Sequence, residues 1–415
     1  MIGKGALLVV FAFILAFSTF QVKMTERVLA TSDNFVNTFM ETLIHETSLS
    51  AMNFAINKVW DEKVKDTTFM VRANHCSSFV DIRKPGSDTV RIKVKTWGKA
   101  FDNDQSVFVS KEDSITAYFA YNMPVSRYFW FTNNEGNVYW TTGDSVWGPM
   151  HTNTVVKTWG APVFYGKVTA KSGITPNPLS KKNKAKFYGG WEVGIENEIP
   201  TDMSNLINAA IAFNGGAPAN TKSVYDKETL FDFQADGSVI RTVQGLPPDT
   251  VKLTDITKAG DGALISSENI RVKGVFNGKM SIYTTKNIYI DDDIVYADNP
   301  ETNPNSNDIL GLVAENKVLI TDNAANNSDC NIQACVMAVK GAYGAENYAS
   351  RPLSGVLRFT GSIVQNKRGP VGTFSYGTGL KTGFSKRYRF DARLSSISPP
   401  HYPFLKSLRL IAWWE

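Results

Sequence analysis

Histidine is scarce in this chain of 415 residues, and its scarcity excludes several classes of catalytic and metal site. The four histidines are His45, His75, His151 and His401, and no two of them stand at the spacing of paired metal ligands. The sequence also lacks a P-loop, a dinucleotide-binding glycine pattern and the Gly-x-Ser-x-Gly motif of hydrolases. We therefore expect a protein that is not an enzyme.

Cysteine is scarcer still, with only Cys76, Cys330 and Cys335, and this excludes a small secreted scaffold rich in disulfides. Five residues of extended strand would separate Cys330 from Cys335 by roughly 16 Å and turn them to opposite faces. A disulfide between them therefore needs a bend in the chain. The simplest expectation is three small buried hydrophobic residues, with one disulfide left open.

Charged residues are absent from Gly5–Val22, and neither Gly nor Pro occurs between Ala6 and Lys84. As a helix, this uncharged run is about 27 Å long, enough to cross a membrane once. No Ala-x-Ala-like cleavage site follows it, which favours a retained anchor over a signal peptide. Because apolar residues continue at helical spacing to Val59, residues 1–66 are predicted to form a membrane anchor and an amphipathic stalk in one helix.

Lys4 and Gly5, followed by Ala6 and the apolar run, resemble the leader junction and N-terminal helix of type IV pilins. The resemblance implies processing between Gly5 and Ala6, and packing with other pilin-like subunits through the helix. A major pilin has Glu at the fifth mature position, where this chain has Val10. This difference favours a minor or accessory subunit. A simple anchored surface protein with no filament partner is the alternative.

After residue 66, short runs of β-branched and aromatic residues alternate with turn residues, which predicts a mainly β body. Residues 67–146 are predicted to form a first β-rich domain and residues 404–415 a tail. Between 147 and 403, strands recur at roughly 20-residue spacing, which favours a right-handed parallel β-helix over an antiparallel β-sandwich. Within this body, Thr201–Phe213 is predicted to be a helix that Thr201 or Ser204 caps and that ends at Gly215 and Gly216.

Four motifs support a family resemblance: WGPMHTNTVVKTWGAPVFYGKVT, DILGLVAENKVLI, GVLRFTGSIVQNKRGPVGTF and GFSKRYRFDARLSSISPPHYP, in this order. Together they resemble a bacterial family known only as domain of unknown function 4900, over Trp147 to Pro403. The resemblance implies an exported envelope or pilus-associated protein and no established activity. The segment from Tyr388 to Arg393, with Pro399 and Pro400, is predicted to close the open end of the β-helix.

Acidic residues concentrate at one place: Asp291, Asp292 and Asp293 end a strand, and Asp298, Glu301 and Asp308 follow in an Asn-rich loop. Hard oxygen ligands in one loop suit Ca²⁺, although the spacing differs from that of an EF-hand. A calcium site formed by Asp291, Asp292, Asp293, Asp298 and Asp308 is thus one interpretation, and a solvated acidic edge is the other. A β-helix enzyme acting on glycans, with Asp291 to Asp293 as acids, is the enzymatic alternative.

Basic residues near the C-terminus alternate with aromatic ones in a pattern that suits either contact with acidic surface polymers or an ordinary strand: Lys381, Phe384, Lys386, Arg387, Tyr388, Arg389, Phe390 and Arg393. The net charge of +5 arises from 44 basic and 39 acidic residues mixed along the chain, which argues against nucleic-acid binding. We expect a non-enzymatic surface protein of the bacterial envelope, for adhesion or filament assembly. Its expected partners are the membrane, pilin-like subunits and surface glycans.

Overall fold

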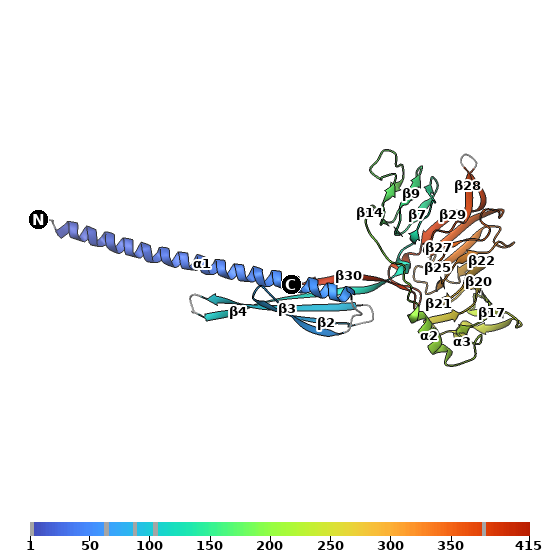
Figure 1. The fold of residues 1–415 in the computed structure, drawn as a ribbon, viewed down its shortest axis with the longest axis horizontal. Coiled ribbons are helices and arrows are strands. Elements are labelled where there is room, and N and C mark those ends of the chain that lie inside the picture. Colours follow the sequence, from blue (N-terminus) through green and yellow to red (C-terminus); the bar gives the residue numbers. More distant parts are fainter. Residues whose placement is uncertain (1–3, 62–65, 86–88, 103–106, 376–378) are drawn as a thin grey trace. The chain divides into compact units, whose positions relative to one another are not determined.

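The computed structural model describes residues 4–61, 66–85, 89–102, 107–375 and 379–415, and it is mainly β with one long N-terminal helix (Figure 1). The chain divides into two compact units. The first comprises Met1–Asn122 with Ser407–Glu415, and the second comprises Met123–Lys406. The domain ranges expected from the sequence divide the chain differently and stay a prediction.

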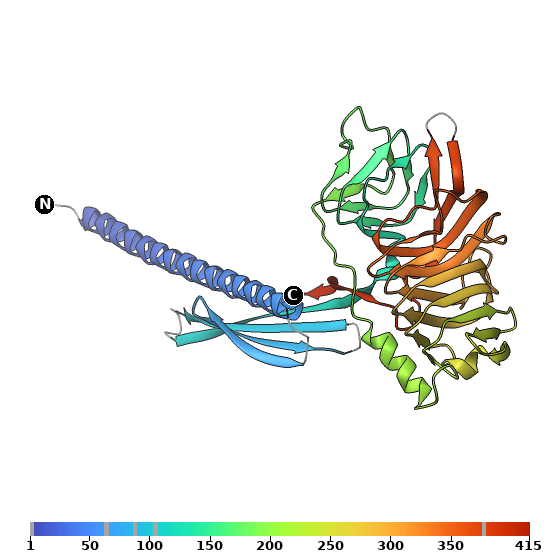
Figure 2. The same ribbon diagram turned by 45° about the vertical axis from the view of Figure 1, so that its right-hand side comes forward.

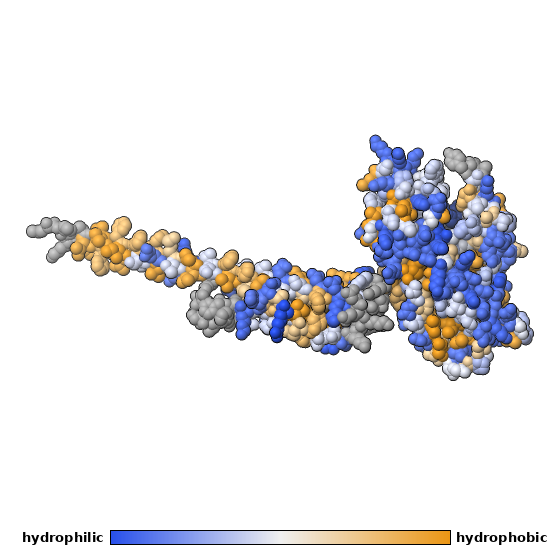
Figure 3. Space-filling model, in the orientation of Figure 1, coloured by the Kyte–Doolittle hydropathy of each residue, from blue (hydrophilic) through white to orange (hydrophobic). Residues whose placement is uncertain are grey.

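The helix α1 (Lys4–Asp61) is 58 residues long, which confirms the prediction of one continuous helix. Residues 7–22 of α1 are uncharged and exposed, and Figure 3 shows apolar residues in orange along this end of the helix. Burial begins at Ile44 and continues at helical spacing through Ala51, Ala55 and Val59. The same helix therefore has one half without a protein partner among the described residues and one half with a packed face.

The first unit packs the second half of α1 on a sheet with the strand order β1-β2-β3-β4-β30. The consecutive strands pair antiparallel, and β2 alternates buried and exposed residues, so that one face of the sheet meets the helix. The last residues, expected to be a tail, form β30 beside β4. The strands of this unit are β1 (Thr67–Ala73), β2 (Cys76–Arg83), β3 (Thr89–Asp102), β4 (Val107–Pro124) and β30 (Phe404–Trp414).

The second unit contains the other strands, most of them short. The early ones are β5 (Trp130–Asn134), β6 (Trp140–Thr141), β7 (Ser145–Trp147), β8 (Met150–Thr152), β9 (Val156–Trp159), β10 (Val163–Phe164), β11 (Val168–Ala170), β12 (Ile174–Thr175), β13 (Lys186–Phe187) and β14 (Trp191–Val193). The later ones are β15 (Val224–Tyr225), β16 (Thr229–Phe233), β17 (Ser238–Val243), β18 (Asp249–Lys252), β19 (Gly262–Ser266), β20 (Ile270–Phe276), β21 (Lys279–Thr284), β22 (Ile288–Tyr296), β23 (Ile309–Ala314), β24 (Val318–Ile320), β25 (Cys330–Ala338), β26 (Tyr343–Ala345), β27 (Leu353–Lys367), β28 (Gly372–Ser375) and β29 (Gly379–Phe390).

Most pairings in this unit are parallel and join strands that are not consecutive. A first ladder runs β15-β19-β21-β23-β25-β27-β5-β8-β11-β14. A second ladder shares β25 and β27 with the first and continues through β29, β7, β10 and β13. The right-handed parallel β-helix stays a prediction, and so does its alternative, the antiparallel sandwich.

In space, the strands from the beginning of this unit lie next to the strands from its end. Both β5 and β29 pair with β27, and β8 and β7 lie beyond them (Figure 2). Tyr388 is consequently a core residue, flanked in the ladder by Phe359 and Val146. The expectation that the segment from Tyr388 closes an open end was wrong, because strands from the beginning of the unit cover it.

The helix predicted at Thr201–Phe213 is confirmed as α2 (Ser204–Asn214), and Gly215 ends it in the left-handed conformation with φ 58°. The predicted caps were wrong, because Met203 is the N-cap residue and the Asp202 carboxylate accepts a hydrogen bond from the Ser204 amide. The remaining helices are short: η1 (Val125–Arg127), α3 (Leu253–Ile256) and η2 (Ala392–Ser395).

All three cysteines are free and buried. In β25, Cys330 contributes to one hydrophobic cluster and Cys335 to another, as expected for residues on opposite faces of a strand. Burial raises the pKa of both thiols above the usual range. These cysteines therefore act as small core side chains in this structure.

Candidate functional site

A groove of about 520 Å³ lies in the second unit, over β7, β27 and β29. Side chains from these strands and from the loop after β22 line it. The lining residues are Gly143, Ser145, Trp147, Glu301, Arg358, Thr360, Lys386, Arg387, Tyr388 and Arg389. Four of these residues are cationic, and Glu301 is the one carboxylate among them.

The parallel register explains why these residues meet. Arg358 of β27 is the partner of Arg387 in β29, and Thr360 is the partner of Arg389. In turn, Arg389 is the partner of Trp147 in β7. Side chains at the same register position of a parallel ladder stand about 4.8 Å apart. The groove is therefore a surface made by several strands rather than by one loop.

The three arginines differ in how far they are neutralised. Arg358 forms an exposed ion pair of 2.8 Å with Asp329, and Arg389 lies 3.3 Å from Glu301. The Arg387 guanidinium donates to the main-chain oxygen of Lys386, and no carboxylate partner of it occurs among the described residues. Arg387 is thus the cation of the groove most available to a ligand.

Lys386 occupies the inner wall of the groove. Its ammonium group lies 3.3 Å from an Asp144 carboxylate oxygen and 5.6 Å from the centre of the Trp140 ring. Burial lowers the pKa of Lys386, and the Asp144 carboxylate opposes this shift. The side chain is only 15% exposed, so its charge acts from beneath the groove.

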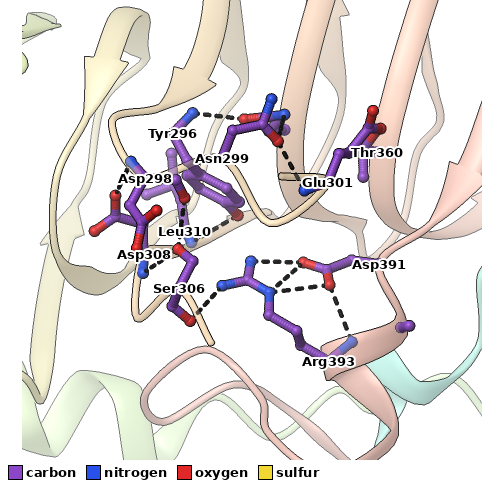
Figure 4. A network of polar contacts seen from close by, with 12 residues as sticks. Tyr296, Asp298, Asn299, Glu301, Ser306, Asp308, Leu310, Thr360, Asp391 and Arg393 are labelled. Carbon is purple, nitrogen blue, oxygen red and sulfur yellow. Dashed lines mark hydrogen bonds and ion pairs between the residues drawn. The ribbon is translucent and has the colours of Figure 1, made fainter. Parts of the chain in front are cut away.

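Hydrogen bonds hold the acidic loop that follows β22 at the other side of the groove (Figure 4). The two Asp308 carboxylate oxygens accept from the amides of Gly278 and Asp298. The Ser306 hydroxyl donates to the Asp298 carbonyl, and the Ser306 carbonyl accepts from Arg393 at 2.8 Å. The loop predicted to bind calcium is therefore fixed by its own acidic and hydroxyl side chains.

This fixed loop carries Glu301 to the groove. The Thr360 hydroxyl donates to one Glu301 carboxylate oxygen at 3.0 Å, and Arg389 lies against the other. Two residues earlier, the Asn299 side chain accepts from Gln333 of β25. Figure 4 shows Glu301 turned toward Thr360 and away from Asp298 and Asp308. Glu301 thus belongs to the groove rather than to an acidic cluster.

The other predicted calcium ligands are dispersed. Asp291 forms an ion pair of 2.6 Å with Arg271, and Asp293 accepts from the Asn331 amide at 2.7 Å. Asp292 accepts from the Asp293 amide. No group of three or more His, Cys, Asp or Glu side chains suited to a metal occurs in the part of the chain that the structure describes. The calcium site stays a prediction, and the Asp291 carboxylate pairs with the Arg271 guanidinium.

An exposed aromatic row continues the groove along the second ladder. The Trp147 and Tyr165 rings stack with centroids 3.7 Å apart and an interplanar angle of 17°, and Tyr165 stacks on Tyr188 at 5.5 Å. Trp147 is 51% exposed and Tyr188 65%. Each ring precedes a glycine, in Trp147-Gly148, Tyr165-Gly166 and Tyr188-Gly189. This repeated aromatic-glycine pair was the sequence signal that could have revealed the row.

Of the basic residues expected to contact acidic polymers, Lys386, Arg387 and Arg389 line the groove, whereas Lys381 and Arg393 do not. Sequence reasoning did not identify Arg358, because it lies in another strand. Gly5 and Ala6, the predicted processing residues, lie in the first turns of α1, and processing there stays a prediction.

No family model matches the chain, and no curated protein does. The resemblance to the domain of unknown function 4900 family therefore has no support beyond the motifs. Among solved structures, the chain matches the crystal structure of the competence-associated pilin ComZ from Thermus thermophilus, with a TM-score of 0.34 and 10% identity, over 91% of this chain and 97% of that chain. Similarity at this level does not establish a common fold.

Proposed function

We propose that this chain is a non-enzymatic surface protein of the bacterial envelope, anchored by α1 and related in design to minor pilins. The observation that carries the proposal is the exposed apolar half of α1. Leu7, Phe13 and Phe17 are 69%, 75% and 61% exposed, and none of the 18 most apolar helix residues is buried by other parts of the chain. Water is an unfavourable environment for so long an apolar surface.

A lipid bilayer or a bundle of similar helices would cover this surface. By length and composition α1 is able to cross a membrane. The second half of the helix packs on an antiparallel sheet through Met52 and Ala55, so the anchor continues directly into a folded unit. A type IV pilin-like subunit combines these features, and Val10 in place of Glu favours an accessory position in a filament.

We further infer that the parallel ladders of the second unit form a right-handed β-helix that this anchor displays. The support is the regular pairing of alternate strands, such as β19 with β21 and β21 with β23. A binding role fits the groove better than glycoside hydrolysis does. Hydrolysis of that kind generally uses two carboxyl groups, and the described lining of the groove contains Glu301 alone.

Alkaline carbonate extraction of the full chain from bacterial membranes tests the anchor. We expect the protein to stay in the membrane pellet, and Ile14→Lys to release much of it, because a lysine is unfavourable at the centre of a spanning helix. Phe39→Lys is the matched control, since this exposed residue of α1 lies outside the uncharged run. Complete extraction of the unaltered chain would refute the anchor.

Sequencing the mature N-terminus, in a bacterium with a type IV pilus system, tests the pilin-like role separately. A first residue of Ala6 is the expected result, because leader processing would cut after Gly5. The protein should then also occur in filaments sheared from the cell surface. A first residue of Met1, with recovery only in the membrane fraction, would leave a simple anchored protein.

A further inference from the structure

The groove over β7, β27 and β29 has an outward face formed by residues that alternate with core side chains. In β27 and β29, Phe359 and Tyr388 point into the core, so their neighbours in sequence point outward. One outward row contains Arg358 and Arg387, and the next contains Thr360 and Arg389. A ligand that lies across the strands therefore meets Arg358 and Arg387 one strand step apart, at about 4.8 Å, and then reaches β7. A groove that crosses three strands suits an extended polymer better than a compact molecule.

The excess of cationic side chains in the groove favours an anionic ligand. Two of the arginines have exposed carboxylate partners, which water screens strongly, so the ion pairs with Asp329 and Glu301 can be exchanged at small cost. Arg387 has no carboxylate partner among the described residues, so a ligand can bind it without breaking an ion pair. A guanidinium binds a carboxylate or sulfate through two parallel hydrogen bonds, and arginine is better suited to this than lysine. Arg358 and Arg387, as register partners, present two such groups side by side.

Trp147 supplies an apolar platform at the end of these rows. Tyr165 covers one face of its indole ring, and Trp147 also lines the groove on the side of its register partner Arg389. The second face of the ring is therefore open to a ligand lying over Arg389. The electron-rich face of an aromatic ring attracts polarised C–H groups, of which a sugar ring has several on each side.

Glu301 and Thr360 distinguish a glycan from a nucleic acid. The Glu301 carboxylate accepts hydrogen bonds, and a sugar ring offers several hydroxyl donors to it. A DNA backbone offers only anionic phosphates, which a carboxylate repels, and nucleic-acid sites neutralise phosphates with continuous basic tracks. Four cations beside one carboxylate match a ligand that carries both acidic groups and hydroxyl groups.

We propose that this groove binds an acidic polysaccharide, in which the acidic groups pair with Arg358 and Arg387, a sugar ring packs on Trp147, and hydroxyl groups donate to Glu301. The proposal deepens the surface role proposed above by naming the class of partner. It is tested in solution, so that a failure to bind is distinguishable from a failure of membrane anchoring.

The experiment measures binding of hexagalacturonate to the purified full chain in detergent by isothermal titration. We expect binding that weakens with added salt, because the arginines are exposed. Arg387→Ala and Trp147→Ala should each weaken binding about tenfold or more, while Arg72→Ala, an exposed arginine in β1 of the other unit, leaves it unchanged. The melting temperature of each variant shows that the second unit is still folded.

Cellohexaose and a single-stranded oligothymidylate serve as comparison ligands under the same conditions. Equal binding of cellohexaose would overturn the acidic character of the ligand. Tighter binding of the oligothymidylate, lost in Arg387→Ala, would assign the groove to nucleic acid and overturn the proposal. Absence of hexagalacturonate binding, or binding that both groove variants retain, would overturn it as well.

Discussion

The two units of this protein bury their cores in different ways. In the first, each of the first four strands pairs with its neighbour in sequence, and α1 covers the sheet. In the second, most strands pair with partners two or more positions away, and β5 pairs with β27 across more than 200 residues. Apart from β30, which comes from the end of the chain, the first unit therefore depends mainly on local contacts, whereas the second is completed only when the ends of its own chain segment meet.

The beginning and the end of the second unit meet where β5 pairs with β27, and we call this contact the seam. There Arg368 forms an ion pair of 2.8 Å with Glu135, and both side chains are almost fully buried, at 4% and 1% exposure. The guanidinium lies 4.0 Å from the centre of the Trp140 ring, and Trp130 donates to the same carboxylate. A charged group in such a place is stable only with its partner. The difference between the units can be tested at this seam first.

Arg368→Met should have the largest effect, about 3–5 kcal/mol, because it leaves the Glu135 carboxylate buried without its cation. Hydrogen exchange should increase in residues 130–193 and 353–367 and remain unchanged in β2 and β3. Arg358→Met is the matched control, since its ion pair with Asp329 is exposed and contributes at most about 1 kcal/mol. Equal losses in both variants would contradict a seam.

Gly166→Ala should destabilise the same region by about 3 kcal/mol through overpacking. A Cβ atom at Gly166 would lie 2.0 Å from the carbonyl oxygen of Gly148, which belongs to the neighbouring strand connection. Gly136→Ala provides the control, because its Cβ meets nothing within 4 Å and only the left-handed backbone, with φ 61°, opposes it at about 1–2 kcal/mol. Denaturant unfolding of the full chain measures both.

Met52→Ala tests the first unit, with an expected loss of about 2–3 kcal/mol for a fully buried side chain between α1 and the sheet. The loss should appear as faster hydrogen exchange in β2, β3 and the second half of α1, with the second unit unaffected. Asn53→Ala, on the exposed side of the same helix turn, should change the stability little. Coupled destabilisation of β25 and β27 would break the distinction between the units.

His151 gives the smallest expected effect, as a pH dependence confined to the second unit. Burial lowers its pKa below the usual 6.5, while a hydrogen bond with Asn153 at 2.9 Å partly opposes the shift. The unfolded chain thus binds the proton more readily. Stability should be full above pH 6.5 and fall below it, by at most about 1.4 kcal/mol per pH unit, until the folded histidine also titrates. His151→Gln should flatten this dependence.

The sequence predicts the two units to different extents. The reason is that the units differ in how many of their contacts are local. Periodicity and the lack of Gly and Pro identify α1, and Gly215 identifies the end of α2, because these signals are local. No local pattern states that β5 pairs with β27 or that β7 pairs with β29, and the expectation of a closing cap at Tyr388 failed because β7 covers β29. The groove was only partly recognised, since Arg358 and Arg387 become neighbours only through the parallel pairing of β27 with β29.

The order of the strands in the ladders also bears on how such a protein changes in length. The described pairings leave β14 at one end of the first ladder and β15 at the other, and these strands are consecutive in the chain. A duplicated strand unit placed between residues 194 and 223 would extend either end without interrupting an existing pair. The same addition before β5 would have to separate β27 from β5, and after β29 it would have to separate β29 from β7. Variation in length among homologous chains should therefore concentrate within one internal interval.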